Sequence, residues 1–182
     1  MSDLGDRVPI PPKDTMNIGL TSATEAVMLK KFGKPGPLTP ACSDPTGKFK
    51  KRIRFGFDVG PFKVSGLDFA VESLRQIFGE VRQQQPAVFQ EIKTAGVLCV
   101  RSRRGNPSRF SNHSWGTAID LFVGKAVVPQ GTPLTHRGIF LIFPFFNRHG
   151  WYWGAEFSGD SVDTMHFELA QETILKMSDI PL

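Results

Sequence analysis

The stretch that decides the fold is "SRFSNHSWGTAIDLFVG", residues 108–124. Its second half, 117–123, has the apolar and β-branched composition of a buried strand, yet it carries Asp120 at its centre. A carboxylate among apolar neighbours costs free energy unless a cation pairs with it. The sequence therefore predicts that Asp120 faces either a basic side chain from elsewhere in the chain or a metal ion.

A histidine in the same stretch offers a metal ligand. His113 precedes Asp120 by seven positions, which would place the two side chains on opposite faces of one straight strand. Gly116 lies between them and gives the backbone the freedom to turn, so that both side chains can converge. Another short strand, "DTMHFEL" (163–169), contributes His166.

Two histidines and one carboxylate form the ligand set of a catalytic zinc site, because they leave one tetrahedral position open. His113, Asp120 and His166 are therefore candidate ligands of Zn²⁺. The competing interpretation is that a histidine among aromatic residues is simply packed and hydrogen-bonded, and we apply it to His136 and His149.

The wider pattern predicts an α+β fold, in which a small antiparallel sheet holds the zinc site and packs against helices. Ser22 and Glu25 stand at capping-box spacing, and Pro144 is expected to kink a buried helix for which a strand is the alternative. Helices are expected over 22–33, 65–81, 86–96, 136–150 and 170–177, and strands over 97–101, 117–123, 151–154 and 165–169.

Length and charge limit the class of protein. The 182 residues suit one compact domain that buries about 70% of its unfolded surface. The net charge of +5, concentrated in "KFKKRIR" (48–54) and "RSRRGNPSR" (101–109), favours an anionic partner. No zinc-finger spacing, heptad repeat or RNA-binding signature accompanies this charge, so we expect no nucleic-acid partner. No apolar run approaches the ~20 residues of a membrane span, and we expect a monomer.

The two cysteines, Cys42 and Cys99, lie too far apart in sequence to indicate a metal-binding pair. We interpret both as reduced, with Cys99 buried in the strand expected over 97–101. A disulfide bond between them is the less favoured alternative.

Three separated motifs together resemble one enzyme family. They are "SNHSWGTAID" (111–120), read as Ser-x-His-x-x-Gly-x-Ala-x-Asp, "GWYWG" (150–154) and "DTMHFEL" (163–169). In this order they resemble the zinc D,D-carboxypeptidase and L-alanyl-D-glutamate endopeptidase family. Those enzymes cut peptidoglycan stem peptides and share their fold with lysostaphin-type peptidases and the Hedgehog signalling domain. The resemblance covers about residues 65–175 and leaves out the first fifty.

The resemblance implies that His113, Asp120 and His166 are zinc ligands and that Asp163 is the general base. A carboxylate at that position can take a proton from the attacking water and return it to the leaving amine, provided that the chain turns just before His166. The alternative for Asp163 is a turn residue, since Asp is common before strands.

The segment "CVRSRRG" (99–105) resembles the family's arginine segment in the form C-x-R-x-x-R-G. The resemblance implies that Arg101 stabilises the oxyanion, with Arg104 as the second choice and a candidate for substrate binding. Arg103 is an additional arginine, for which a surface charge is the favoured interpretation. The tyrosine that often precedes the family's arginine is missing.

Four further side chains are candidates around the cleft. Ser111 is expected to bind substrate or to stiffen the loop that presents the first histidine. Trp115 and Trp153 are expected to wall the cleft as substrate-binding residues, with core packing as the alternative. Glu168 shares the strand parity of His166 and is a candidate to orient that ligand through a hydrogen bond.

The expected function is zinc-dependent hydrolysis of peptidoglycan stem peptides by a domain spanning 51–182, with 1–50 as an irregular N-terminal wrap around one short helix. "D-x-M-H-F-E" resembles the endopeptidase branch, which favours L-Ala–D-Glu cleavage, and D,D-carboxypeptidase action is the alternative.

Two other classes of function remain open. One is a zinc-holding domain without activity, against which Asp163 argues, and the other is a nucleic-acid-binding protein. The start of the chain shows no secretory signal, so we expect synthesis in the cytoplasm and action in the periplasm or on the cell wall, as a phage lysin or an exported antibacterial toxin.

Overall fold

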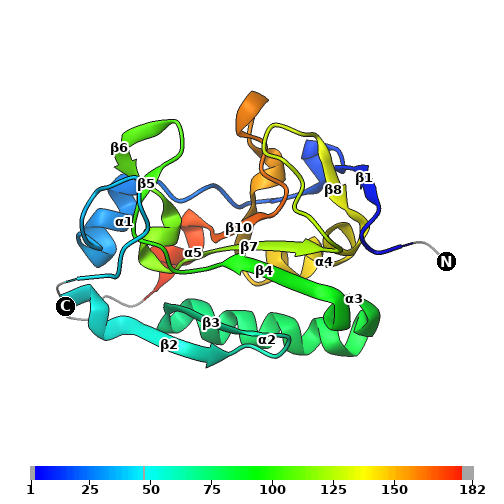
Figure 1. Cartoon of the computed structure of the whole chain (residues 1–182), viewed down its shortest axis with the longest axis horizontal. Coiled ribbons are helices and arrows are strands. Elements are labelled where there is room, and N and C mark those ends of the chain that lie inside the picture. The colour runs from blue at the N-terminus through cyan, green and yellow to red at the C-terminus, as the bar shows by residue number, and fades with distance from the viewer. Residues whose placement is uncertain (1–2, 47, 178–182) are drawn as a thin grey trace.

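The computed structural model describes residues 3–46 and 48–177 and has the α+β class expected from the sequence (Figure 1). Its helices are α1 (Glu25–Phe32), α2 (Asp68–Gln84), α3 (Pro86–Glu91), α4 (Arg137–Arg148) and α5 (Gln171–Lys176). Its strands are β1 (Arg7–Pro9), β2 (Ile53–Asp58), β3 (Lys63–Leu67), β4 (Ile92–Gly96), β5 (Ser102–Arg103), β6 (Asn106–Phe110), β7 (Ala118–Val123), β8 (Leu134–His136), β9 (Trp151–Trp153) and β10 (His166–Leu169).

A four-stranded antiparallel sheet in the order β4-β7-β10-β9 forms the centre of the fold. Helix α2 and the β2–β3 hairpin lie along one side of this sheet (Figure 1). The β5–β6 hairpin and the segment 154–161, drawn in orange, stand on the opposite side. Helix α2 thus covers one side of the sheet, and loops stand over part of the other.

Strand β7 shows why Asp120 does not point into the core. Ile119, Leu121 and Val123 alternate with Asp120 and Phe122, and only the first three are fully buried, where α4 packs against the strand. Asp120 and Phe122 are half-buried on the other face. Alternation along the strand therefore turns Asp120 away from the face that α4 covers.

Helix α2 begins later than expected, at Asp68 instead of at Ser65 or Gly66. The residues before it pair with β2 as strand β3, in which Gly66 lies opposite Arg54. The Asp68 carboxylate lies in the first turn, where negative charge is favourable, and accepts a hydrogen bond from the Phe69 N–H.

Helix α1 is present, but its cap is Thr24 and not Ser22. The Thr24 hydroxyl accepts the hydrogen bond from the Val27 N–H, at 3.4 Å. The capping box expected from Ser22 and Glu25 is wrong, because both side chains bond elsewhere: Ser22 to Glu168 and Glu25 to the Phe110 N–H.

The helix expected over 86–96 and the strand expected over 97–101 are both misplaced. Helix α3 ends at Glu91, and the next five residues form β4, with Ile92 opposite Val123 of β7. Long-range pairing at the edge of the sheet outweighs the local helical pattern here. Within 97–101, Val100 makes only an isolated bridge to Ser43.

The other elements that the sequence predicts are present. The segment expected over 136–150 is helix α4, with Pro144 inside it. Strands β9 and β10 and helix α5 also lie where the sequence indicates. The sequence does not predict strands β1, β2, β5, β6 and β8; of these, β1 pairs with β8, β2 with β3, and β5 with β6. None of the helices within 3–46 and 48–177 is long and apolar enough to cross a membrane.

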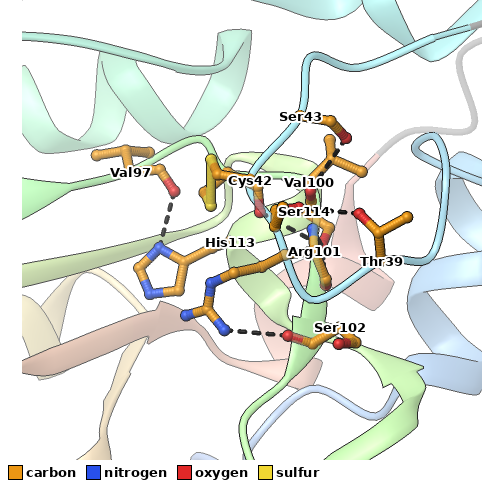
Figure 2. The surroundings of a disulfide bond; sticks show 11 residues. Thr39, Cys42, Ser43, Val97, Val100, Arg101, Ser102, His113 and Ser114 are labelled. Carbon is orange, nitrogen blue, oxygen red and sulfur yellow. Dashed lines mark hydrogen bonds between the residues drawn. A yellow bond between two sulfur atoms is a disulfide. The ribbon is translucent and has the colours of Figure 1, made fainter.

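The interpretation of both cysteines as reduced is wrong in this structure, because Cys42 and Cys99 form a disulfide bond with a Cα–Cα distance of 5.1 Å (Figure 2). Each cysteine directly precedes one partner of the Ser43–Val100 bridge, so the paired backbones bring the two sulfurs together. Cys99 is half-buried and lies outside any strand. Because the two cysteines are 57 residues apart, their spacing in the sequence does not indicate that they pair.

Candidate metal centre

Three side chains converge on the loop-covered side of the sheet. The Asp120 Oδ1 lies 3.3 Å from the His113 Nε2 and 3.1 Å from the His166 Nδ1, and the two histidine nitrogens are 3.3 Å apart. The three residues form a group whose ligand atoms all lie within 4.8 Å of one another. The structure therefore brings together all three predicted ligands.

Backbone geometry explains the convergence. His166 and Asp120 are register partners of the antiparallel β10–β7 pair. His113 lies in a short 3₁₀ helix, Asn112–Trp115, which ends at Gly116 in the left-handed region with φ of 64°. A Cβ at that glycine would lie 2.6 Å from the Gly66 Cα, so this turn requires glycine.

Both histidines are oriented by a further hydrogen bond. The His113 Nδ1 lies 2.8 Å from the carbonyl oxygen of Val97, and the His166 Nε2 lies 2.9 Å from the Glu168 Oε2. When these outer nitrogens carry the ring proton, the His113 Nε2 and the His166 Nδ1 present free lone pairs to the shared centre. The expected contact between Glu168 and His166 is present.

This donor set fits zinc. Two imidazole nitrogens and one carboxylate oxygen converge from half-buried or buried side chains and leave one tetrahedral position for solvent or substrate. Burial raises the pKa of Asp120, but the two histidines outweigh this effect and hold it well below its usual value. Asp120 therefore stays a carboxylate at neutral pH, as a ligand must.

The centre opens into a cavity of about 380 Å³, and Asp163 lines it together with the three candidate ligands. The turn expected before His166 is present, with the His166 N–H 3.3 Å from the Asp163 carbonyl oxygen. Burial, and the nearby charge of Asp120, raise the pKa of Asp163. Such a carboxyl group is suited to exchanging a proton.

Gly154 allows the Asp163 loop to approach the centre. A Cβ at this position would lie 2.7 Å from the Asp163 carbonyl oxygen and 3.2 Å from the His166 Cβ. The Asp163 N–H also donates a hydrogen bond to the Gly154 carbonyl, at 3.0 Å. The final glycine of "GWYWG" is therefore required by close packing.

Arg101 enters the same cavity from the segment that the disulfide bond holds (Figure 2). Its guanidinium donates a hydrogen bond to the Ser102 carbonyl, at 3.0 Å. Burial, followed by the charge of Arg104, lowers the pKa of Arg101. Arg104 and Arg103 also line the cavity, and both are exposed. Arg103 is thus an exposed charge, as favoured from the sequence, that lies at the cavity.

Ser111 lines the cavity, whereas the two tryptophans do not. Trp115 and Trp153 are fully buried, and their indole N–H groups donate to the carbonyls of Gly33 and Thr164. The expectation that they wall the cleft is corrected by this burial, and core packing describes both.

The other two histidines lie outside the cavity lining. The His136 Nδ1 accepts a hydrogen bond from the Val123 N–H at 3.3 Å, and the His149 Nε2 lies 2.6 Å from the Glu80 Oε1. Both are packed, hydrogen-bonded side chains.

Several cavity residues were not identified from the sequence. Two of them, Ser22 and Asn112, hydrogen-bond Glu168; Asn112 directly precedes the first histidine of the motif, which is the one signal that points to it. The others are Gln130, Phe157, Ser158, Ser161 and Met165. They come from loops whose approach depends on the whole fold.

Residues 104–169, about a third of the chain, match the model of a family described as D-alanyl-D-alanine carboxypeptidase. The match includes the three candidate ligands, Asp163 and Glu168, and leaves out Arg101. No curated protein and no solved structure matches the chain significantly. The match and the His113–Asp120–His166 group together support a place for this chain in the superfamily of zinc peptidases of the D-alanyl-D-alanine carboxypeptidase type.

Proposed function

We propose that the protein is a zinc endopeptidase that cleaves the L-Ala–D-Glu bond of peptidoglycan stem peptides. The observation that carries the proposal is that Asp163 shares one cavity with a His113–Asp120–His166 group. A metal-binding domain without activity has no need of a half-buried carboxyl group beside, and not within, the ligand set.

Each group at the candidate site has a distinct role in the proposed hydrolysis. Zinc, when bound by His113, Asp120 and His166, acts as a Lewis acid and lowers the pKa of water to about 7. Asp163 accepts a proton from the attacking water and donates it to the departing amine nitrogen. Arg101 faces the scissile carbonyl and stabilises the negative charge that its oxygen acquires.

The charges of the cavity fit an acidic peptide. Arg101, Arg103 and Arg104 line it, and a stem peptide carries carboxylates that such side chains bind. The net charge of +5 favours adsorption to anionic cell wall. A phage lysin or an exported antibacterial toxin, acting in the periplasm or on the wall as a monomer, is the biological role that we propose.

Digestion of purified peptidoglycan sacculi, followed by mass analysis of the soluble products, tests the proposal. Cleavage between L-Ala and D-Glu releases stem peptides that begin with D-Glu, whereas the D,D-carboxypeptidase alternative releases only free D-alanine. Asp163→Asn serves as the inactive control. Intact sacculi after incubation with the zinc-loaded protein would contradict both activities and favour a zinc-binding domain without turnover.

A further inference from the structure

The segment that precedes α1 lies outside the family match, yet it reaches the metal centre through Glu168. The Glu168 Oε1 accepts a hydrogen bond from the Ser22 hydroxyl at 2.6 Å and another from the Ala23 N–H at 3.1 Å. Glu168 itself is 3% exposed. A buried carboxylate is therefore held by residues that are some 145 positions away in sequence.

The second oxygen of Glu168 completes the connection to the centre. The Oε2 accepts a hydrogen bond from the Asn112 Nδ2 at 2.8 Å and lies 2.9 Å from the His166 Nε2. The Asn112 Nδ2 also donates to the Ala23 carbonyl, at 3.1 Å. Ser22, Ala23 and Asn112 thus surround the carboxylate and leave it one orientation toward the histidine.

That orientation matters for the ligand. His166 can offer its Nδ1 to a metal only when the ring proton is on the Nε2, and Glu168 is the acceptor that favours this tautomer. A carboxylate free to rotate would hold the ring less firmly. The groups that fix Glu168 therefore contribute to metal affinity without touching the metal.

We propose that Ser22 is a positioning residue of the metal centre, which acts by fixing Glu168 as the hydrogen-bond acceptor of His166. This inference rests on the zinc site of the proposed function. It makes the N-terminal segment part of the site and not merely a wrap around it.

The neighbouring residue supplies a matched control. The Thr21 hydroxyl donates to the Glu172 Oε1 at 2.7 Å, which is the same kind of bond in the same segment. Glu172 lies in α5 and does not line the cavity. Removal of the Thr21 hydroxyl therefore perturbs the attachment of the segment without changing the surroundings of Glu168.

The test compares Ser22→Ala with Thr21→Ala by measuring the dissociation constant for Zn²⁺ in competition with a chelator, without substrate. Loss of a partner that orients a metal ligand costs about 10–100-fold in affinity, which we expect for Glu168→Gln. Ser22 acts one step further out, so Ser22→Ala should weaken zinc binding roughly 5-fold, and Thr21→Ala should not. Ser22→Thr, which keeps the hydroxyl, should bind zinc more tightly than Ser22→Ala.

A double-mutant cycle distinguishes positioning from a general loosening of the fold. In a Glu168→Ala background, Ser22→Ala should change zinc affinity no further, because its effect passes through the missing carboxylate. Equal zinc affinity of Ser22→Ala and wild type, or equal losses for Ser22→Ala and Thr21→Ala, would overturn the inference. If the Glu168 variants do not fold, the comparison at positions 21 and 22 still decides. Because no substrate is used, an inactive peptidase with a Ser22-dependent zinc site would contradict the proposed function alone.

Discussion

Asp120 and His166 lie opposite each other on two antiparallel strands, with the Asp120 Oδ1 3.1 Å from the His166 Nδ1. The register of β7 and β10 fixes this distance, so two of the three candidate ligands belong to the sheet itself. A slip of one residue would turn His166 to the opposite face. The pairing of β7 and β10 therefore determines the geometry of the metal centre.

The protein should bind about one zinc ion per chain through the three side chains. His166→Ala should lose most of this zinc, because two ligands cannot close the site. His149→Ala is the control, since that histidine bonds Glu80 and lies outside the cavity lining. Elemental analysis after purification without chelator checks this, and equal zinc in wild type and His166→Ala would show that the ligands are assigned wrongly.

Asp163→Asn should keep its zinc and its fold while losing about 10²–10⁴-fold in hydrolysis, because an amide cannot take a proton at neutral pH. Asp163→Glu keeps the chemistry and shifts its position, so partial activity is expected. The exposed Asp160 in the same loop lies outside the cavity lining, and Asp160→Asn should be fully active. Hydrolysis of sacculi by Asp163→Asn at the wild-type rate would leave Asp163 with the role of a turn residue.

Arg101→Ala should lower turnover by about 10²–10³-fold with zinc content unchanged, because its proposed partner acquires charge only in the transition state. Arg109, exposed in β6 and outside the cavity lining, provides the control Arg109→Ala. Single-turnover rates and zinc content measure the two properties separately. If Arg104→Ala shows the loss and Arg101→Ala does not, Arg104 is the group that binds the oxyanion.

The Cys42–Cys99 disulfide should stabilise the segment that carries Arg101 and the Val97 carbonyl. Removing a bond that closes a loop of this length typically costs about 2–4 kcal/mol of unfolding free energy. Denaturant unfolding of the wild type with and without dithiothreitol should show this loss, and Cys42→Ser should unfold like the reduced protein in both conditions. Identical unfolding of wild type in both conditions would argue against the bond.

Glu80 should contribute stability that depends on pH. The hydrogen bond from His149, followed by that from Arg148, lowers the pKa of Glu80. Because the folded pKa lies below the unfolded value of about 4.3, the contribution is present above that pH and is lost as pH falls through the folded pKa. Glu80→Gln should cost at most about 1 kcal/mol at pH 7, since solvent reaches the Glu80–His149 pair and screens it. The difference from wild type in denaturant unfolding should vanish in acid; a difference that grows there would contradict the sign.

The parts of the fold that could be predicted from sequence are those with a strong local signal. Helices α2 and α4 bury faces with clear periodicity, and β7 alternates around Asp120. The ends of α3 and β4 could not be predicted, because the pairing of Ile92 with Val123 across the sheet, and not local propensity, decides them.

The residues of the candidate site also differ in whether a local sequence signal or a long-range contact determines their position. His113, Asp120 and His166 could be proposed from their residue types and positions in short motifs, and Asp163 from the family resemblance of its motif. The contact between Ser22 and Glu168 could not, because it joins distant positions and Ser22 also fits a helix cap. The core positions of Trp115 and Trp153 could not be predicted, because aromatic composition alone does not reveal which side of a sheet a residue faces.

The zinc dependence of peptidoglycan hydrolysis tests the central claim most directly. Protein freed of metal with a chelator should release no stem peptides from sacculi, and activity should rise in proportion to added Zn²⁺ until one equivalent per chain is bound. Hydrolysis by the metal-free protein at the wild-type rate, or none at one equivalent of zinc, would contradict the account.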